Sequence, residues 1–270
     1  MFLALRDLRF ATGRFTLMGA VVALITVLLV MLSGLTAGLG HQNTAVLDDA
    51  AARGTDRIVF GGAAGQEPSA SLTQSEFTAD QRAAWEAADG VVSVEPVGLS
   101  QGRLVGLAEP VTPDASGRAD TAGVDVSGVV SAAFLGVEPG NAQAPAPLAA
   151  GEVVLSQSLA EEAGVAAGGQ VESSGLVLTV ADVVADSYYS HTPVAWTTLA
   201  DWNTLTHAAD PEVLGTAGLV SLADGADADA VASAADHDAG TLATDVQGAY
   251  AALPAYSSEH GSLTMMQGFL

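Results

Sequence analysis

Histidine and methionine side chains gather near the two apolar parts of the chain, and together they could hold haem iron. Both residue types serve as axial ligands of haem in an apolar pocket. One group lies in or just after a long apolar run, and the other lies around the start of a shorter apolar stretch. If the residues in between form a domain inserted between two membrane helices, both groups return to the same membrane level. The candidate haem-contacting residues are therefore Met31, His41, His260, Met265 and Met266.

A second interpretation of these five residues stays open. The methionines could pack against lipid or a neighbouring helix, and the two histidines could lie in interfacial water. The choice depends on the elements that position them, above all on the residues from Phe15 to Leu39.

The run from Phe15 to Leu39 contains no charged residue. About 20 apolar residues in a helix cross a hydrocarbon core that is about 30 Å thick. A cleavable signal peptide is the alternative, but its apolar core is only about 7–15 residues long. The sequence therefore predicts an uncleaved transmembrane helix. Gly34 and Gly38 lie one turn apart in it, a spacing that lets a second helix approach, so we expect helix–helix packing there.

The charged residues on either side of the run predict its orientation. Residues 1–14 hold three arginines and a single aspartate. Because arginine-rich flanks stay in the cytoplasm, we expect the N-terminus there and the chain from about Gly40 onward outside the plasma membrane. Residues 1–14 also alternate apolar and charged side chains, which favours an amphipathic elbow helix in the inner headgroup layer over a disordered basic flank.

The part of the chain after the run is strongly acidic. It holds 30 of the 31 acidic residues and five of the eight arginines, which gives a formal charge of −25. Such a surface repels polyanions, so nucleic-acid binding is excluded. We interpret the acidity as a source of solubility rather than as a specific cation site.

Several kinds of catalytic and metal site are missing from the sequence. Without cysteine there is no disulfide framework, no cysteine-ligated zinc and no cysteine nucleophile. Without lysine there is no Walker-type phosphate loop, so the chain itself has no such ATP site. The five histidines lack the spacing of zinc ligands. A dense group of aspartates lacks the order of a calcium loop and is typical of a solvated helix face: Asp224, Asp227, Asp229, Asp236 and Asp238. We predict no metal site.

One short motif raises an enzymatic alternative. Residues Gly98 to Gly102 match G-x-S-x-G, with Ser100 in the position of a hydrolase nucleophile. That motif acts at a sharp turn between a strand and a helix. The residues after it, Arg103 to Leu107, look like another strand, so the match is typical of chance in a chain rich in glycine and serine. We predict no catalytic residue and no enzymatic activity.

The region outside the run predicts an α+β domain, because short strands and helices alternate with short connections. Thr78 and Gln81 form a capping box that starts a helix ending near Ala88. The stretch Val91–Leu99 reads as a strand interrupted by Pro96, hence an edge or bulged strand. The other expected elements are strands at 56–62, 103–107, 124–130, 152–155, 193–197, 214–222 and 240–244, a hairpin at 170–184, and helices at 156–163, 199–206, 227–235 and 245–253.

These observations divide the chain into four segments. Residues 1–14 form a cytoplasmic amphipathic elbow helix, 15–39 the first transmembrane helix, and 40–255 an extracytoplasmic α+β domain, to which the helix connects through a stalk at 41–53. Residues 256–270 become apolar toward their end and read as the start of a second transmembrane helix, with a frayed C-terminus as the alternative.

Four stretches of the chain resemble one family of membrane proteins. They are residues 1–40, Gly90–Val97, Gly151–Val171 and Ser187–Leu205. Together they resemble the FtsX-like (MacB-type) ABC transporter permeases, and among these the chain is most similar to haem-exporter (HrtB-like) permeases of Gram-positive bacteria. The first stretch is the most specific of the four.

The resemblance implies a four-helix permease that forms a homodimer in the membrane lipid and pairs with a separate cytoplasmic ABC ATPase. ATP hydrolysis would rock the helices and the outer domain and export haem, or another hydrophobic compound, from the membrane. The chain would be the N-terminal portion of such a permease, with haem as a transported compound and no cofactor of its own. A single-pass, membrane-anchored extracytoplasmic binding or scaffold domain is the alternative.

Overall fold

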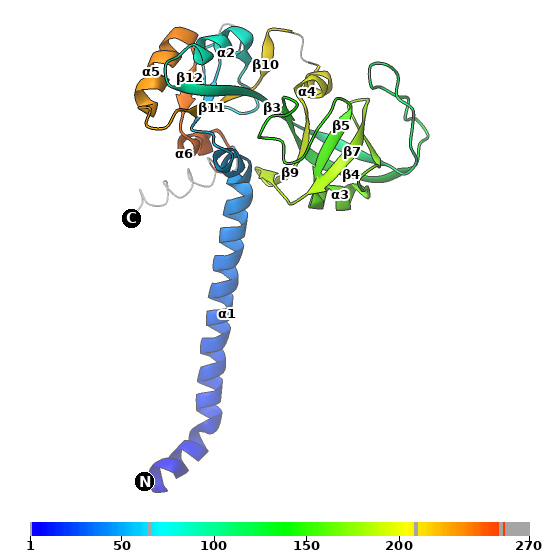
Figure 1. The fold of residues 1–270 in the computed structure, drawn as a ribbon. Coiled ribbons are helices and arrows are strands. Elements are labelled where there is room, and N and C mark those ends of the chain that lie inside the picture. Colours follow the sequence, from blue (N-terminus) through cyan, green and yellow to red (C-terminus); the bar gives the residue numbers. More distant parts are fainter. Residues whose placement is uncertain (1, 64–65, 208–209, 254–255, 257–270) are drawn as a thin grey trace. The chain divides into compact units, whose positions relative to one another are not determined.

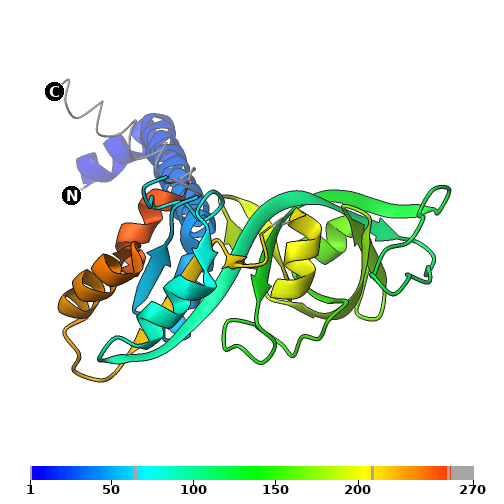
Figure 2. The same ribbon diagram turned by 90° about the horizontal axis from the view of Figure 1, so that it is seen from above.

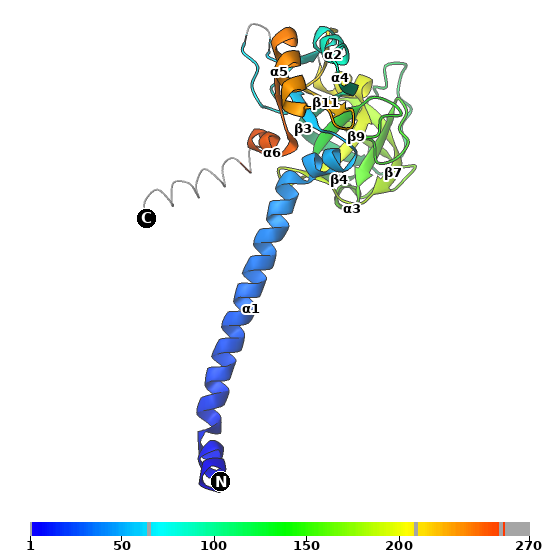
Figure 3. The same ribbon diagram turned by 60° about the vertical axis from the view of Figure 1, so that its left-hand side comes forward.

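A computed structural model describes residues 2–63, 66–207, 210–253 and 256, with the backbone alone at 2–15, 35–41 and 43 (Figure 1). The chain divides into two compact units, Met1–His41 and Gln42–Leu270. Helix α1 spans Phe2–Ala52 without interruption (Figures 1 and 3). The helix predicted for the apolar run and for the stretch after it is therefore confirmed.

The first unit contains the apolar part of α1. Its segment Thr16–Gly34 has a mean hydropathy of 2.5, and its side chains are exposed throughout. By length and composition this segment is able to cross a membrane.

The second unit is built on one large sheet with the strand order β12-β1-β11-β3-β4-β9-β5-β7-β6. Its helices are α2 (Ala79–Glu86), α3 (Gln157–Ala163), α4 (Leu199–Thr206), α5 (Ala228–Ala239) and α6 (Val246–Ala249), and a 3₁₀ turn at Tyr250–Ala252 follows α6. The strands are β1 (Arg57–Phe60), β2 (Phe77–Thr78), β3 (Val91–Leu107), β4 (Val126–Val137), β5 (Glu152–Ser156), β6 (Gln170–Ser173), β7 (Leu176–Val184), β8 (Tyr188–Tyr189), β9 (Thr192–Thr198), β10 (Val213–Gly215), β11 (Ala217–Leu222) and β12 (Leu242–Thr244). The predicted α+β class is confirmed.

Strand β3 divides the second unit into two lobes (Figure 2). We call β12, β1, β11 and the first half of β3, with α2 and α5, the sheet lobe. We call the second half of β3 with β4, β9, β5, β7 and β6, and with α3 and α4, the barrel lobe. The barrel closes because β6 pairs back onto β3, with Val105 opposite Glu172.

Alternate residues of the barrel strands fill one apolar cluster, as expected when every second side chain points inward. Leu104, Phe134, Leu155 and Leu178 are members of it. Helix α4 packs Trp202 over the glycine pair Gly98 and Gly136, which face each other in β3 and β4. A Cβ at these glycines would come within 2.4 Å and 2.5 Å of the tryptophan side chain, so only glycine allows this contact.

The core of the sheet lobe lies under α2 and α5. Trp85 of α2 is fully buried there with Phe77, Val94 and Val220, and its indole nitrogen donates to the hydroxyl of Thr241 at 2.9 Å. The capping box predicted at the start of α2 is present. The capping box favours a helix that starts here, and burial of Trp85 stabilises the same helix, so local sequence and packing support one structure.

The predicted interruption at Pro96 is wrong, because β3 continues for 17 residues through it. The predicted edge position is confirmed, because among the described strands the residues of β3 before Val97 pair with β11 alone. The neighbouring strand β4 begins to pair only at Val97, one residue later. The carbonyl of Val97 accepts from the backbone of Thr216 on the β11 side at 2.8 Å. Successive residues bond to opposite sides, so the nitrogen of Pro96 points to the side on which β4 has ended, and no ladder bond is lost.

Ser100 lies in the middle of this continuous strand, opposite Phe134 of β4. A nucleophile elbow needs a sharp turn into a helix directly after the serine. The enzymatic alternative built on Ser100 is therefore wrong.

Other local predictions meet mixed outcomes. The hairpin β6–β7 and helix α4 are confirmed. The single strand expected at 214–222 is two strands, β10 and β11, separated at Thr216. Thr216 still bonds to β3, since its backbone N–H donates to the Val97 carbonyl at 2.8 Å and its hydroxyl accepts from the Leu99 backbone at 3.0 Å.

Candidate functional site

The last turns of α1, from Gln42 to Ala52, belong to the second unit and are packed into it. Ala45, Val46, Leu47 and Ala50 are buried, whereas the side chains of Thr16–Gly34 are exposed. Burial of a leucine-sized side chain contributes about 1.5–3 kcal/mol. The end of the helix is therefore held by the apolar core rather than lying on its surface.

The core that receives these turns draws on both lobes. The sheet lobe supplies Ile58 and Phe60 of β1 and Leu219 of β11, and the barrel lobe supplies Leu135 of β4 and Trp196 of β9. We call this cluster, with α1 residues 42–52, the helix joint. The buried side chains of these helix turns therefore belong to one apolar cluster with residues of both lobes.

Two aspartates of the joint add hydrogen bonds to distant parts of the chain. Asp49 accepts from the hydroxyl of Ser187, in the loop before β8, at 2.6 Å. Asp48 accepts from the hydroxyl of Tyr250, in the 3₁₀ turn after α6, at 2.5 Å and from Thr44 at 2.7 Å. The Asp48 carboxylate raises the pKa of Tyr250 to about 12, because it favours the protonated phenol.

The turn from α1 into β1 is also fixed by side chains. Gly54 has φ +91°, a conformation that favours glycine, and its carbonyl accepts from Ser221 at 2.7 Å. Thr55 is buried and its hydroxyl accepts from the amide of Gln143 at 3.3 Å. The turn between α1 and β1 is therefore hydrogen-bonded to β11 and to the loop after β4.

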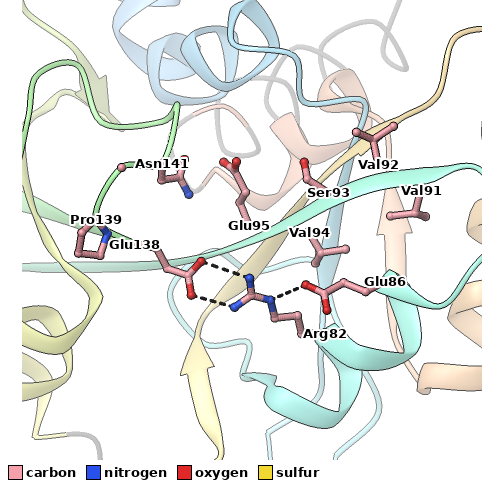
Figure 4. Close-up of a pocket in the computed structure, with 11 residues that line it drawn as sticks. Arg82, Glu86, Val91, Val92, Ser93, Val94, Glu95, Glu138, Pro139 and Asn141 are labelled. Carbon is pink, nitrogen blue, oxygen red and sulfur yellow. Dashed lines mark hydrogen bonds and ion pairs between the residues drawn. The ribbon is translucent and has the colours of Figure 1, made fainter.

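A second feature is a groove of about 510 Å³ between the two lobes (Figure 4). Arg82 of α2 donates to both carboxylate oxygens of Glu138, just after β4, at 2.8 and 3.3 Å, and to Glu86 at 2.8 Å. Burial raises the pKa of Glu95 on β3, and the charge of Glu138 raises it further. The amide of Asn141 and, to a smaller extent, the charge of Arg82 lower it. We call this feature the lobe groove.

The residues proposed from the sequence as haem-contacting are not brought together by the described part of the structure. Met31 lies in the first unit with 68% of its surface exposed, and Gly34 has open space around its Cα. The remaining candidates lie outside the residues, or the side chains, that the structure describes: Gly38, His41, His260, Met265 and Met266. The predicted second membrane helix lies outside them as well. These assignments stay predictions.

Within the described residues, no group of three or more histidine, cysteine, aspartate or glutamate side chains could hold a metal ion. Sequence reasoning missed Asp48, Asp49, Ser187 and Tyr250. The only signal for them was a pair of adjacent acids in an otherwise apolar and small-residue stretch, and their partners are far away in the sequence.

Comparison with known proteins assigns the chain to a family. Residues 15–237 match the model of a family described as the MacB-like periplasmic core domain. The periplasmic region of MacB from Actinobacillus actinomycetemcomitans aligns with 12% identity and a TM-score of 0.47, over 72% of this chain and 90% of that chain. The extracellular domain of the noncanonic ABC-type transporter YknZ from Gram-positive bacteria aligns with 12% identity and a TM-score of 0.46, over 71% and 98%. None of the curated proteins compared with the chain matches it.

Proposed function

Because the chain belongs to the family of the MacB-like periplasmic core domain, we propose that it is the N-terminal part of an ABC exporter permease. In this proposal the apolar helix crosses the plasma membrane, with its N-terminus in the cytoplasm and the α+β unit outside. A homodimer of the permease pairs with a separate cytoplasmic ATPase. The chain itself performs no catalysis.

The observation that supports this proposal best is the helix joint. A transporter driven by a distant ATPase needs its outer domain to follow the movement of a membrane helix. The buried side chains of Leu47 and Ala50, with the hydrogen bonds of Asp48 and Asp49, connect the end of α1 firmly to both lobes. Such a connection passes on a helix displacement because packed cores resist deformation.

An insertion in the helix tests this role. Three glycines placed after His41 would interrupt α1 between the apolar segment and the packed turns from Gln42 to Ala52, while leaving both segments unchanged. In the complete permease with its ATPase, reconstituted in proteoliposomes, we expect transport to be lost and ATP hydrolysis to continue. A matched control places the glycines after Asp120, in an exposed loop between β3 and β4. Unchanged transport in the joint variant would rule out the coupling role.

Haem, or another hydrophobic compound, is the proposed substrate. It would contact Met31, His41, His260, Met265 and Met266 at the outer membrane level. Haem added to the purified full chain in detergent should shift its Soret band, and the shift should weaken when Met31, His41 or His260 is replaced by alanine. A missing shift with the intact permease would remove haem from the proposal and leave the permease role standing.

The coding DNA beyond the codon for Leu270 distinguishes the permease from the alternative. A further apolar run of about 18 or more residues, followed by two later spans, supports a permease. A stop codon there favours a single-pass anchored binding or scaffold domain. A cytoplasmic ATPase that co-purifies with the chain would argue against that alternative.

A further inference from the structure

The first half of β3 has a partner strand on one edge only. Residues Val91 to Pro96 pair with β11. On the other edge, β4 begins to pair at Val97. In the part of the chain that the structure describes, the edge of β3 that faces away from β11 therefore has no second strand before Val97. This open edge is one wall of the lobe groove, which is lined by Val91 to Glu95.

Backbone groups point to this open edge. On β11, the carbonyl of Val220 accepts from Asp56 on the β1 side, so the residue before it, Leu219, faces β3, where it pairs with Glu95. Because successive residues of a strand bond to opposite sides, the N–H and C=O of Val94 point to the open edge. Val92 is passed over by the ladder with β11, where the register shifts. An open strand edge of this kind is a template for another strand.

The groove also presents an apolar surface beside the edge. Val92 is 67% exposed on β3. Across the groove lies the loop after β4, with Glu138, Pro139 and Asn141, and Figure 4 shows it facing the strand. Five successive residues of β3, Val91 to Glu95, line the groove, so an extended chain that pairs with this edge would lie within it.

The net charge of the groove indicates which kind of peptide it would bind. Three carboxylates, those of Glu86, Glu95 and Glu138, face a single guanidinium, that of Arg82. Arg82 is already bonded to Glu86 and Glu138, and none of the ion pairs between described residues includes Glu95. The groove therefore keeps an excess of negative charge that an added cationic side chain would neutralise.

We propose that the lobe groove binds an extended, arginine- or lysine-bearing peptide segment of a protein partner, which adds as a strand to the open edge of β3. The peptide backbone bonds to Val94, its apolar side chains contact Val92 and Pro139, and its cationic side chains reach Glu95 and Glu138. This is strand addition, in which backbone bonds supply affinity and side chains supply selectivity. Pro96, which has no N–H, limits the pairing to the residues before it.

A labelled peptide tests the proposal directly. The probe is a capped heptapeptide of alternating valine and arginine, and its binding to the full chain in detergent is followed by fluorescence anisotropy. We expect saturable binding and slower hydrogen exchange at the Val94 amide. A peptide with glutamate in place of arginine should not bind, because like charges repel.

Two methylated peptides separate strand pairing from simple charge attraction. One has N-methyl groups on its valines and the other on its arginines. Since an extended peptide bonds to one edge through alternate residues, one of the two should lose about tenfold or more in affinity and the other should bind as before. Equal binding of both, or loss of both, would overturn the proposal, and so would the absence of any binding by the unmethylated probe.

Protein variants test where the peptide binds. Glu95→Gln and Glu138→Gln should each weaken binding about threefold, the size expected for a partly exposed ion pair. Glu161→Gln is the matched control, an exposed acid on α3 outside the groove, and should leave binding unchanged. If all three variants weaken binding alike, the peptide follows the overall acidity of the chain, and the proposed site is wrong.

Discussion

The helix joint and the lobe groove lie in the same unit and both include residues of β3, but the joint is buried and apolar whereas the groove is open and charged. At the joint, Val97 and Leu99 of β3 are covered by the end of α1 and by strands of both lobes. At the groove, Val92 and Glu95 of the same strand meet open space and charged side chains. The contacts of the joint with the end of α1 are typical of a permanent part of the fold. The exposed groove is typical of a surface that binds its partner reversibly.

Removing one buried side chain from the joint should have the largest effect. Leu47 is only 3% exposed, so Leu47→Ala should lower the free energy of unfolding by about 2–5 kcal/mol through lost contacts and the cavity left behind. Guanidinium unfolding in detergent, followed by tryptophan fluorescence, measures this change. Val129→Ala is the control, since this side chain is 56% exposed and its loss should cost less than about 0.5 kcal/mol. Equal effects of the two variants would contradict the contrast between covered and open regions.

The local parts of this fold could be predicted from the sequence. The capping box of α2 and the hairpin of β6 and β7 depend on neighbouring residues, and both are present. The apolar run likewise predicted a long helix. Each of these signals acts within a few residues, which is why the sequence alone reveals it.

The parts that depend on distant residues could not be predicted. Pro96 signals a break, and only the position at which β4 ends explains why the strand continues. The closure of the barrel joins β3 to β6, and the bond between Asp48 and Tyr250 joins residues 202 positions apart. The joint was missed for this reason, whereas the haem-contacting candidates came from residue type and stay untested.

The hydrogen bond of Tyr250 to Asp48 should have the next largest effect. Tyr250→Phe removes it, at a cost of about 0.5–1.5 kcal/mol. The folded pKa of Tyr250, about 12, lies above its ordinary value of 10.0. The stabilisation is therefore fully present below pH 10.0 and is lost as the pH rises to about 12. Because burial also raises the pKa of Tyr189, phenolate absorbance should show more than one tyrosine that titrates late. The contribution of Tyr250 should be absent in Tyr250→Phe and should move to lower pH in Asp48→Asn. Titration of all tyrosines together in the unmodified chain would contradict the bond.

A change at the groove should matter less than either change at the joint. Arg82 is bonded to Glu138 and Glu86, but its side chain is 29% exposed. Arg82→Ala should cost about 0.5–1 kcal/mol, since solvent screens such pairs. Arg82→Lys is the control for charge without the forked geometry and should recover only part of the loss. A loss at Arg82 as large as that at Leu47 would show that the groove, too, is a permanent contact.

The smallest expected effect has the opposite sign. Burial raises the pKa of Glu95 above its ordinary value of 4.5, so the folded state binds a proton more readily than the unfolded state, and stability falls as the pH rises through the folded pKa. Glu95→Gln should therefore stabilise the chain at neutral pH, by about 0.5 kcal/mol or less, because the group is partly solvated. The gain should vanish below pH 4.5, where the carboxyl is protonated in both states.

Urea unfolding at neutral and acidic pH measures the difference, with Glu161→Gln as an exposed control. A variant that is less stable at neutral pH would mean that the chain already supplies a cation for Glu95, and the groove would then have no unmet charge for a partner to neutralise.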